Sequence, residues 1–164
     1  MTDQRQELLR LLQRAYALAQ AVELLLGCFS DRHAKRVGFA TAIDAFLTCT
    51  LDQQRVLREC LLRIEGGERA PGLSAHEGIA TVTIPAVQSQ DDALHFLAHV
   101  RALILEEIDL YHSGIAIAEC SGFFETRFVC EGILTQKSLM KEWLSLHMPA
   151  IAGASGQQAP CLSK

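Results

Sequence analysis

The stretch HFLAHVRALILEEIDLYH, residues 95–112, decides the fold class because its apolar residues recur at helical spacing. One face of the expected helix carries Leu97, Val100, Ile104, Ile108, Tyr111 and Ile115. Glu107 lies on this stripe, between Ile104 and Tyr111, whereas His95 and His99 fall on the outer side. The stretch therefore predicts a long amphipathic helix, from about residue 90 to 119, with one inward glutamate.

Three further helices are expected around it. Apolar periodicity predicts a helix over residues 4–29 and a second from about Asp31, with Ser30 as its N-cap, to Ile64. The last helix follows the Ser121–Gly122 turn and runs to about residue 147, where Pro149 is expected to stop it. The chain is thus expected to form one helical domain, residues 1–149, and a flexible tail, residues 150–164.

A long connection, residues 66–90, separates the two pairs of helices. Its segment ATVTIPAV, residues 80–87, is β-branched, and Pro85 would confine any short extended segment to an edge. Two helical hairpins joined by one long crossover predict an all-α four-helix bundle.

Bulk composition narrows the function classes. Hydrophobic residues make up 49% of the 164 and charged residues 21%, as in globular proteins. A net charge of −4 with no basic stripe argues against nucleic acid as a partner. No apolar run approaches the roughly 20 residues of a membrane helix, and the polar start lacks a signal-peptide pattern, so we expect no membrane association and a cytoplasmic location. The six cysteines lack CxxC spacing and are expected to be reduced core thiols.

Two more carboxylates fall on apolar lines of the expected helices. Glu23 lies beside the stripe of the first helix. In the fourth helix, Glu131 shares one line with Phe124, Phe128 and Thr135, so we expect it to point inward. Antiparallel pairing about the turn at residues 121–122 places Glu107 opposite about residue 136.

The segments DDALHFLAHVRALILEEIDLYHSGIAIAEC, residues 91–120, and FFETRFVCEGILTQKSLMKEWLSLH, residues 123–147, resemble the rubrerythrin-like branch of the ferritin-like superfamily. The likeness consists of an inward Glu followed four residues later by Tyr, and a next helix with an aromatic residue before an acid. It covers roughly the last 60 residues and, more loosely, residues 8–65. The resemblance implies a ferritin-like bundle that binds two iron or manganese ions through one Glu from each of two helices and a Glu-x-x-His from each of the others.

Carried over by position, the resemblance implies Glu23 and Glu107 as the single acids, with Glu131 and Asp52 as the acids of the two Glu-x-x-His motifs. The histidine positions of these degenerate motifs hold Leu134 and Arg55.

Other interpretations of the acids and histidines stay open. The acids could instead reach solvent or pair with an arginine such as Arg55 or Arg101, because an unpaired buried carboxylate is too costly. His112 could face Glu131 near the turn of the second hairpin. Asp92, His95 and His99 could hold a metal on the outer face of the third helix, since carboxylate and imidazole suit zinc, nickel and copper.

Two hypotheses about function follow. The first is a ferritin-like protein that binds iron or manganese for redox chemistry or iron handling. The second is a metal-free bundle acting as an interaction or scaffold protein, as a homodimer, because apolar residues such as Leu9, Leu24, Leu94 and Leu105 extend beyond one stripe. No nucleophile elbow, phosphate loop or dinucleotide motif occurs, so the sequence names no catalytic residue and leaves open whether the chain is an enzyme.

Overall fold

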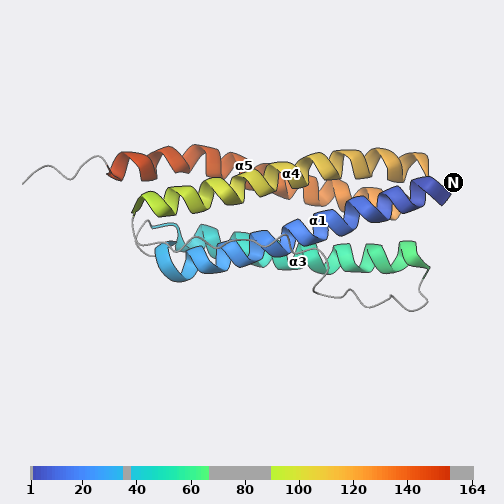
Figure 1. Cartoon of the computed structure of the whole chain (residues 1–164), viewed down its shortest axis with the longest axis horizontal. Helices are drawn as coiled ribbons and strands as arrows, with labels where there is room; N and C mark the ends of the chain where they lie inside the picture. The colour runs from blue at the N-terminus through green and yellow to red at the C-terminus, as the bar shows by residue number, and fades with distance from the viewer. Residues whose placement is uncertain (1, 35–37, 67–89, 156–164) are drawn as a thin grey trace, which may run out of the picture.

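The computed structural model of the protein describes residues 2–34, 38–66 and 90–155. Its elements in chain order are α1 (Thr2–Phe29), a short π-helical turn η1 (Ser30–Ala34), α3 (Ala40–Glu65), α4 (Gln90–Cys120) and α5 (Phe124–Ser155). The four long helices lie along one axis, and the described residues contain no strand (Figure 1). The prediction of an all-α four-helix bundle is confirmed.

The helices form two antiparallel hairpins, α1 with α3 and α4 with α5 (Figure 1). α1 packs against both α3 and α4, α4 packs against α5, and a sparser contact between α3 and α5 closes the ring. The end of α3 and the start of α4 lie at opposite ends of the bundle (Figure 1). A long crossover is therefore required, as the sequence indicated, but residues 67–89 and the extended segment expected there lie outside the described residues.

Two helix boundaries differ from the sequence expectation. Ser30 does not cap a helix starting at Asp31; its hydroxyl donates to Asp44 Oδ1 at 3.0 Å, and α3 begins only at Ala40. α5 continues through Pro149 to Ser155. Pro149 removes one donor to the carbonyl four residues earlier, but the following turn places Ile151 in the core, where it is buried, and this packing holds the helix together.

The glycines at the end of α3 and in the α4–α5 turn adopt the left-handed conformation that other residues avoid. Gly66 ends α3 with φ of 96° and donates its N–H to Arg63, and Gly122 makes the α4–α5 turn with φ of 78°. The turn at 121–122 was predicted correctly. It fixes the register of α4 against α5.

The core consists of two apolar clusters separated along the bundle axis. One contains Leu26, Ile43, Val100, Ile104, Met140 and Leu144, and the other contains Leu12, Leu57, Leu61, Tyr111, Cys130 and Ile133. The middle of the bundle is a distinct layer, because the buried residues between the two clusters in α3, α4 and α5 are polar, namely Thr50, Gln53, Gln54, Glu107 and Lys137. No helix of the described residues is both long enough and apolar enough to cross a membrane.

Candidate functional site: a buried ion pair in a central polar layer

A set of polar side chains crosses the bundle between the two apolar clusters; we call it the central polar layer. Its buried members are Thr50, Gln53 and Gln54 from α3, Glu107 from α4 and Lys137 from α5. Glu23 of α1 joins at the edge, where Gln54 Nε2 donates to its Oε2 at 2.7 Å. All four long helices therefore contribute to one layer at mid-bundle.

Glu107 and Lys137 form the centre of this layer, and both side chains have 0% exposure. Lys137 Nζ donates to Glu107 Oε1 at 3.1 Å and lies 2.9 Å from Oε2. Burial raises the pKa of the Glu107 carboxyl, and the neighbouring Lys137 ammonium opposes that rise. An unpaired ion could not be kept here, so the two residues stabilise each other.

Tyr111 lies one helical turn beyond Glu107 and is completely buried. Its hydroxyl has no hydrogen-bond partner among the described residues, as is true of Thr50 Oγ1, Gln53 Oε1 and Glu107 Oε2. Burial, and then the nearby Glu107, raise the pKa of Tyr111 well above its ordinary value. The phenol is therefore a neutral group beside the ion pair.

The sequence-predicted metal ligands do not gather around Glu107. The side chain of Asp52 is 71% exposed, and that of Glu131 is 40% exposed and pairs with Arg127 at 2.9 Å. Glu23 is half-buried and held by Gln54, and His112 is exposed. Within residues 2–34, 38–66 and 90–155, no three His, Cys, Asp or Glu side chains come together in a group that could hold a metal ion.

The prediction that Glu131 points inward is wrong, and so is the prediction for the other residues on its line of α5. Phe124 is 55% exposed and Phe128 is 64% exposed, and Thr135 is exposed as well. The inner line of α5 is Thr126, Cys130, Ile133, Lys137, Met140 and Leu144. The two phenylalanines led to the wrong face being predicted as buried. The true core line has a lysine at its middle, and a lysine is usually exposed.

Lys137 is the functional candidate that sequence reasoning missed. A signal for it existed: pairing α4 with α5 about the turn at residues 121–122 places Glu107 opposite about residue 136, one position from Lys137. The inward position of Glu107 itself is confirmed.

The donor set of the layer does not fit a two-metal centre. Glu107 is the only buried carboxylate that the described residues bring into the layer, and it already has an ammonium group against both oxygens. A dication at this place would have to lie beside Lys137, and the other buried side chains of the layer, Thr50, Gln53 and Gln54, offer only amide and hydroxyl groups. The layer can hold a proton and a charge pair, but its side chains are not a ligand set for iron or manganese.

Among the described residues, the histidines and cysteines elsewhere form no second group that could hold a metal ion. His95 and His99 are exposed, as expected, and the side chain of Asp92 lies outside the described part of the chain. The five cysteines up to Cys130 are free thiols, of which Cys60 and Cys130 are buried. Burial raises the pKa of the Cys130 thiol to about 12, so it stays protonated and unreactive at neutral pH.

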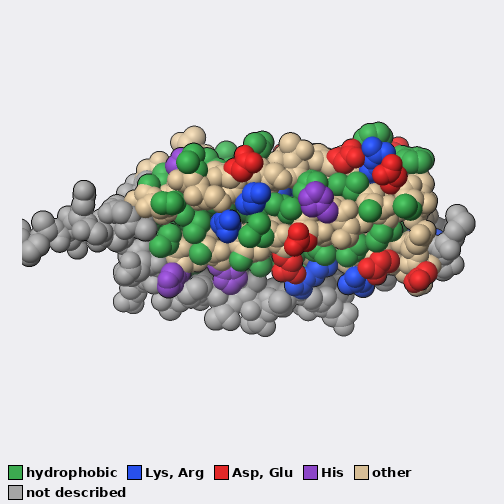
Figure 2. Space-filling model, turned by 90° about the horizontal axis from the view of Figure 1, so that it is seen from above, with side chains coloured by type: hydrophobic (Ala, Val, Ile, Leu, Met, Phe, Trp, Pro, Cys, Tyr) green, Lys and Arg blue, Asp and Glu red, His purple; other side chains and the backbone are tan. Residues whose placement is uncertain are grey.

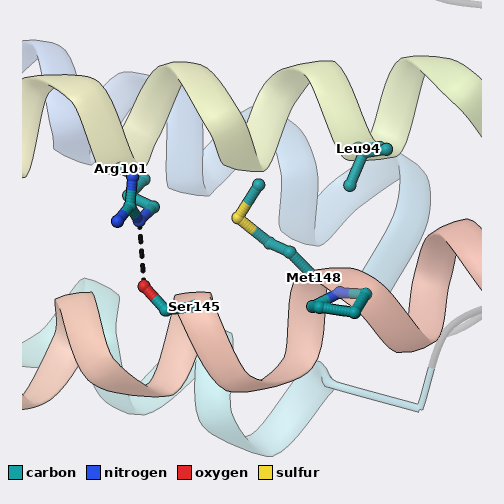
Figure 3. Close-up of a pocket in the computed structure, with 5 residues that line it drawn as sticks. Leu94, Arg101, Ser145 and Met148 are labelled. Carbon is teal, nitrogen blue, oxygen red and sulfur yellow. Dashed lines mark hydrogen bonds between the residues drawn. The ribbon is translucent and has the colours of Figure 1, made fainter.

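An open cavity of about 320 Å³ lies between α4 and α5 near the start of α4 (Figure 3). Leu94, Met148 and Pro149 line it, and Arg101 Nε donates to Ser145 Oγ at 2.9 Å at one side. The cavity is apolar apart from this guanidinium–hydroxyl contact, and it lies well away from the ion pair.

The fold and the layer thus define a class of protein: a four-helix bundle whose mid-bundle polar layer is organised by a buried glutamate–lysine pair. The chain belongs to the family described as a domain of unknown function, DUF892, whose model matches residues 3–156. It is similar to a protein from Xanthomonas campestris pv. campestris of known crystal structure, with 26% identity, a TM-score of 0.72 and coverage of 93% of this chain and 94% of the other. No curated protein is detectably similar to the chain.

Proposed function

We propose that this protein is a ferritin-like bundle in which the Lys137 ammonium takes the place of a metal centre, and that it acts as an interaction protein and not through metal chemistry. The observation that carries the proposal is the position of Lys137 Nζ, 2.9 and 3.1 Å from the two oxygens of Glu107. The Lys137 ammonium neutralises the buried carboxylate as a metal ion would. Unlike a metal ion, it is part of the chain and cannot coordinate a substrate.

The ferritin-like relationship is supported by the topology and by the place of the layer. Two hairpins joined across the length of the bundle are typical of this class, and metal sites in such bundles are built from side chains of facing helices at mid-core. Glu107 and Lys137 come from the adjacent helices α4 and α5, and Gln53 and Gln54 come from α3.

An interaction role is supported by the surface. Large apolar side chains remain exposed at several positions; on α5 these are Phe124, Phe128, Leu139 and Leu146, and Leu139 is 62% exposed. Figure 2 shows hydrophobic side chains exposed along the length of the viewed face, between charged groups. Four large exposed apolar side chains on one helix favour a surface that binds another protein.

The metal content of the purified protein tests the proposal. Wild-type protein is prepared without chelator, loaded with Fe²⁺, Mn²⁺ or Zn²⁺, desalted, and analysed by inductively coupled plasma mass spectrometry. We expect no stoichiometric metal. A Glu107→Ala variant and a His99→Ala variant are the matched controls for the layer and for the outer histidines.

Stoichiometric metal in the wild type that is lost in Glu107→Ala would overturn the proposal and restore the iron or manganese hypothesis. Metal that is lost only in His99→Ala would indicate a site at the outer histidines of α4. The protein would then not be metal-free, although the central polar layer would hold no metal.

A further inference from the structure

The open cavity between α4 and α5 has an apolar body and one charged end (Figure 3). Among the described residues that line it, Arg101 is the single charged one, and the others are Leu94, Ser145, Met148 and Pro149. Its volume of about 320 Å³ lies at the lower end of the range for ligand pockets, roughly 300–1,000 Å³. The cavity therefore has the size of a small-molecule site and an amphipathic lining.

Two helix faces form the walls of the cavity. Leu94 and Arg101 are two helical turns apart on one face of α4, and at 1.5 Å per residue they are separated by about 10 Å along its axis. Ser145, Met148 and Pro149 lie on the facing side of α5. Figure 3 shows Met148 reaching toward α4 between Arg101 and Leu94. The apolar part of the cavity thus lies between the guanidinium at one end and Leu94 at the other.

The Arg101 guanidinium is held in place without being neutralised. Its Nε donates to Ser145 Oγ at 2.9 Å, and this bond orients the plane of the group. Arg14 and Arg127 face carboxylates of the chain, but Arg101 has no ion-pair partner among the described residues. Its two terminal NH₂ groups can therefore donate to an anion from outside the chain.

These polar groups favour a carboxylate as the head group of a ligand. The planar fork of a guanidinium matches the two oxygens of a carboxylate, and such bonds are stronger than those between neutral groups. Ser145 Oγ accepts the bond from Arg101 and keeps its own hydrogen, which it can donate to the same anion. A cationic head group would be repelled by Arg101, and a neutral one would leave the charge unpaired.

The apolar lining favours an alkyl chain of limited length behind that head group. Leu94 and Met148 are half-buried and pack against the apolar cluster that contains Val100 and Leu144. A methionine side chain is flexible and adapts to the shape of an alkyl chain. An extended chain advances about 1.2 Å per bond, so a carboxylate of about eight carbons spans the roughly 10 Å between Arg101 and Leu94.

We propose that this cavity binds a medium-chain alkyl carboxylate, with its head group on Arg101 and Ser145 and its chain against Leu94, Met148 and Pro149. The site is separate from the central polar layer and does not depend on the proposed function. About ten ligand atoms in an open cavity, with one charge-assisted contact, give an expected dissociation constant on the order of 0.1 mM.

Octanoate is the probe, titrated into the full-length protein and followed by calorimetry and by NMR of methyl groups. We expect saturable binding with shifts at the methyl groups of Leu94 and Met148. Arg101→Gln should weaken it about ten-fold or more, because the charge-assisted bonds are lost. Arg14→Gln removes an arginine that faces Glu106 and is the matched control, with the affinity expected to stay unchanged. Far-UV circular dichroism checks that both variants are folded.

Three further ligands separate the contributions of head group and chain. Octylammonium and octanol should bind at least about ten-fold more weakly than octanoate, because neither pairs with the guanidinium. Butanoate should also be weaker by about ten-fold or more, because it buries four fewer methylene groups.

Two results would overturn the site itself: wild-type protein that shows no saturable octanoate binding up to about 10 mM, or binding that Arg101→Gln leaves unchanged. Equal affinity for octanol or octylammonium would refute the carboxylate head group. Equal affinity for butanoate would show that the charge alone binds and would refute the role of the apolar lining. Methyl shifts confined to other parts of the bundle would place the ligand elsewhere and refute the assignment to this cavity.

Discussion

Replacing Lys137 by methionine tests the role of the buried pair most directly. Methionine fills a similar volume without charge, so Glu107 is left buried without its ammonium partner. At 2.9 Å and an effective dielectric constant of about 20, the attraction within the pair is on the order of 6 kcal/mol. Breaking a buried pair by removing one partner costs about 3–5 kcal/mol, and we expect Lys137→Met to lose about that much free energy of unfolding at pH 7.

The double variant Glu107→Met with Lys137→Met is the control. It removes both charges, and replacing a buried pair by apolar residues is often neutral or stabilising. We therefore expect the double variant to recover most of the loss seen in Lys137→Met. The assay is urea unfolding followed by circular dichroism at 222 nm, combined as a double-mutant cycle.

Two outcomes would refute this reasoning. A Lys137→Met variant within about 1 kcal/mol of wild type would mean that Glu107 does not need the ammonium. A double variant that is less stable than Lys137→Met would mean that the two side chains contribute packing or other contacts and not a mutual charge interaction.

Four further predictions follow from single observations. Because burial raises the pKa of Glu107, the unfolded chain binds fewer protons than the folded one just above pH 4.5, so the contribution of Glu107 to the free energy of unfolding should fall as pH rises there. Urea titrations should show the free energy of unfolding of wild type falling relative to that of Glu107→Gln over this range, and a relative rise with pH would contradict the prediction. Tyr111→Phe removes a buried hydroxyl without a described partner and should raise the free energy of unfolding by about 1 kcal/mol; a loss of that size would reveal a partner for the hydroxyl. Pro149→Ala restores a donor to the carbonyl of Ser145 and should raise the thermal midpoint, whereas an unchanged midpoint would show that the turn tolerates proline without strain. Ile151→Ala should cost about 2 kcal/mol and reduce helicity at the end of α5; unchanged circular dichroism would show that this residue does not hold the last turn.

Helical periodicity made the four-helix bundle predictable. Leu97, Val100 and Ile104 repeat at the spacing of one helix face and are buried. This spacing can be found in the local sequence alone. The turn at Gly122 could also be predicted, because glycine adopts the left-handed conformation that such a turn needs. The inward position of Glu107 followed from the apolar stripe of its own helix, and with the turn fixed, antiparallel geometry placed a position near residue 136 of α5 opposite it.

The neighbours of Glu107, and the face of α5 that turns inward, were decided only by the tertiary structure. The line with Phe124 and Phe128 looked like a core line and Lys137 looked like a surface residue, because residue type alone ranks aromatic side chains above an ammonium group for burial. In the folded bundle the Glu107 carboxylate lies opposite Lys137, and this ion pair offsets the desolvation cost of burying the lysine. The face of α5 with Lys137 therefore turns inward, and the phenylalanines stay outside. Such a pairing joins residues 30 positions apart in different helices, so no local pattern contains it. The sequence by itself determined that there would be a bundle with a glutamate inside it; packing determined that the cation beside that glutamate is a lysine.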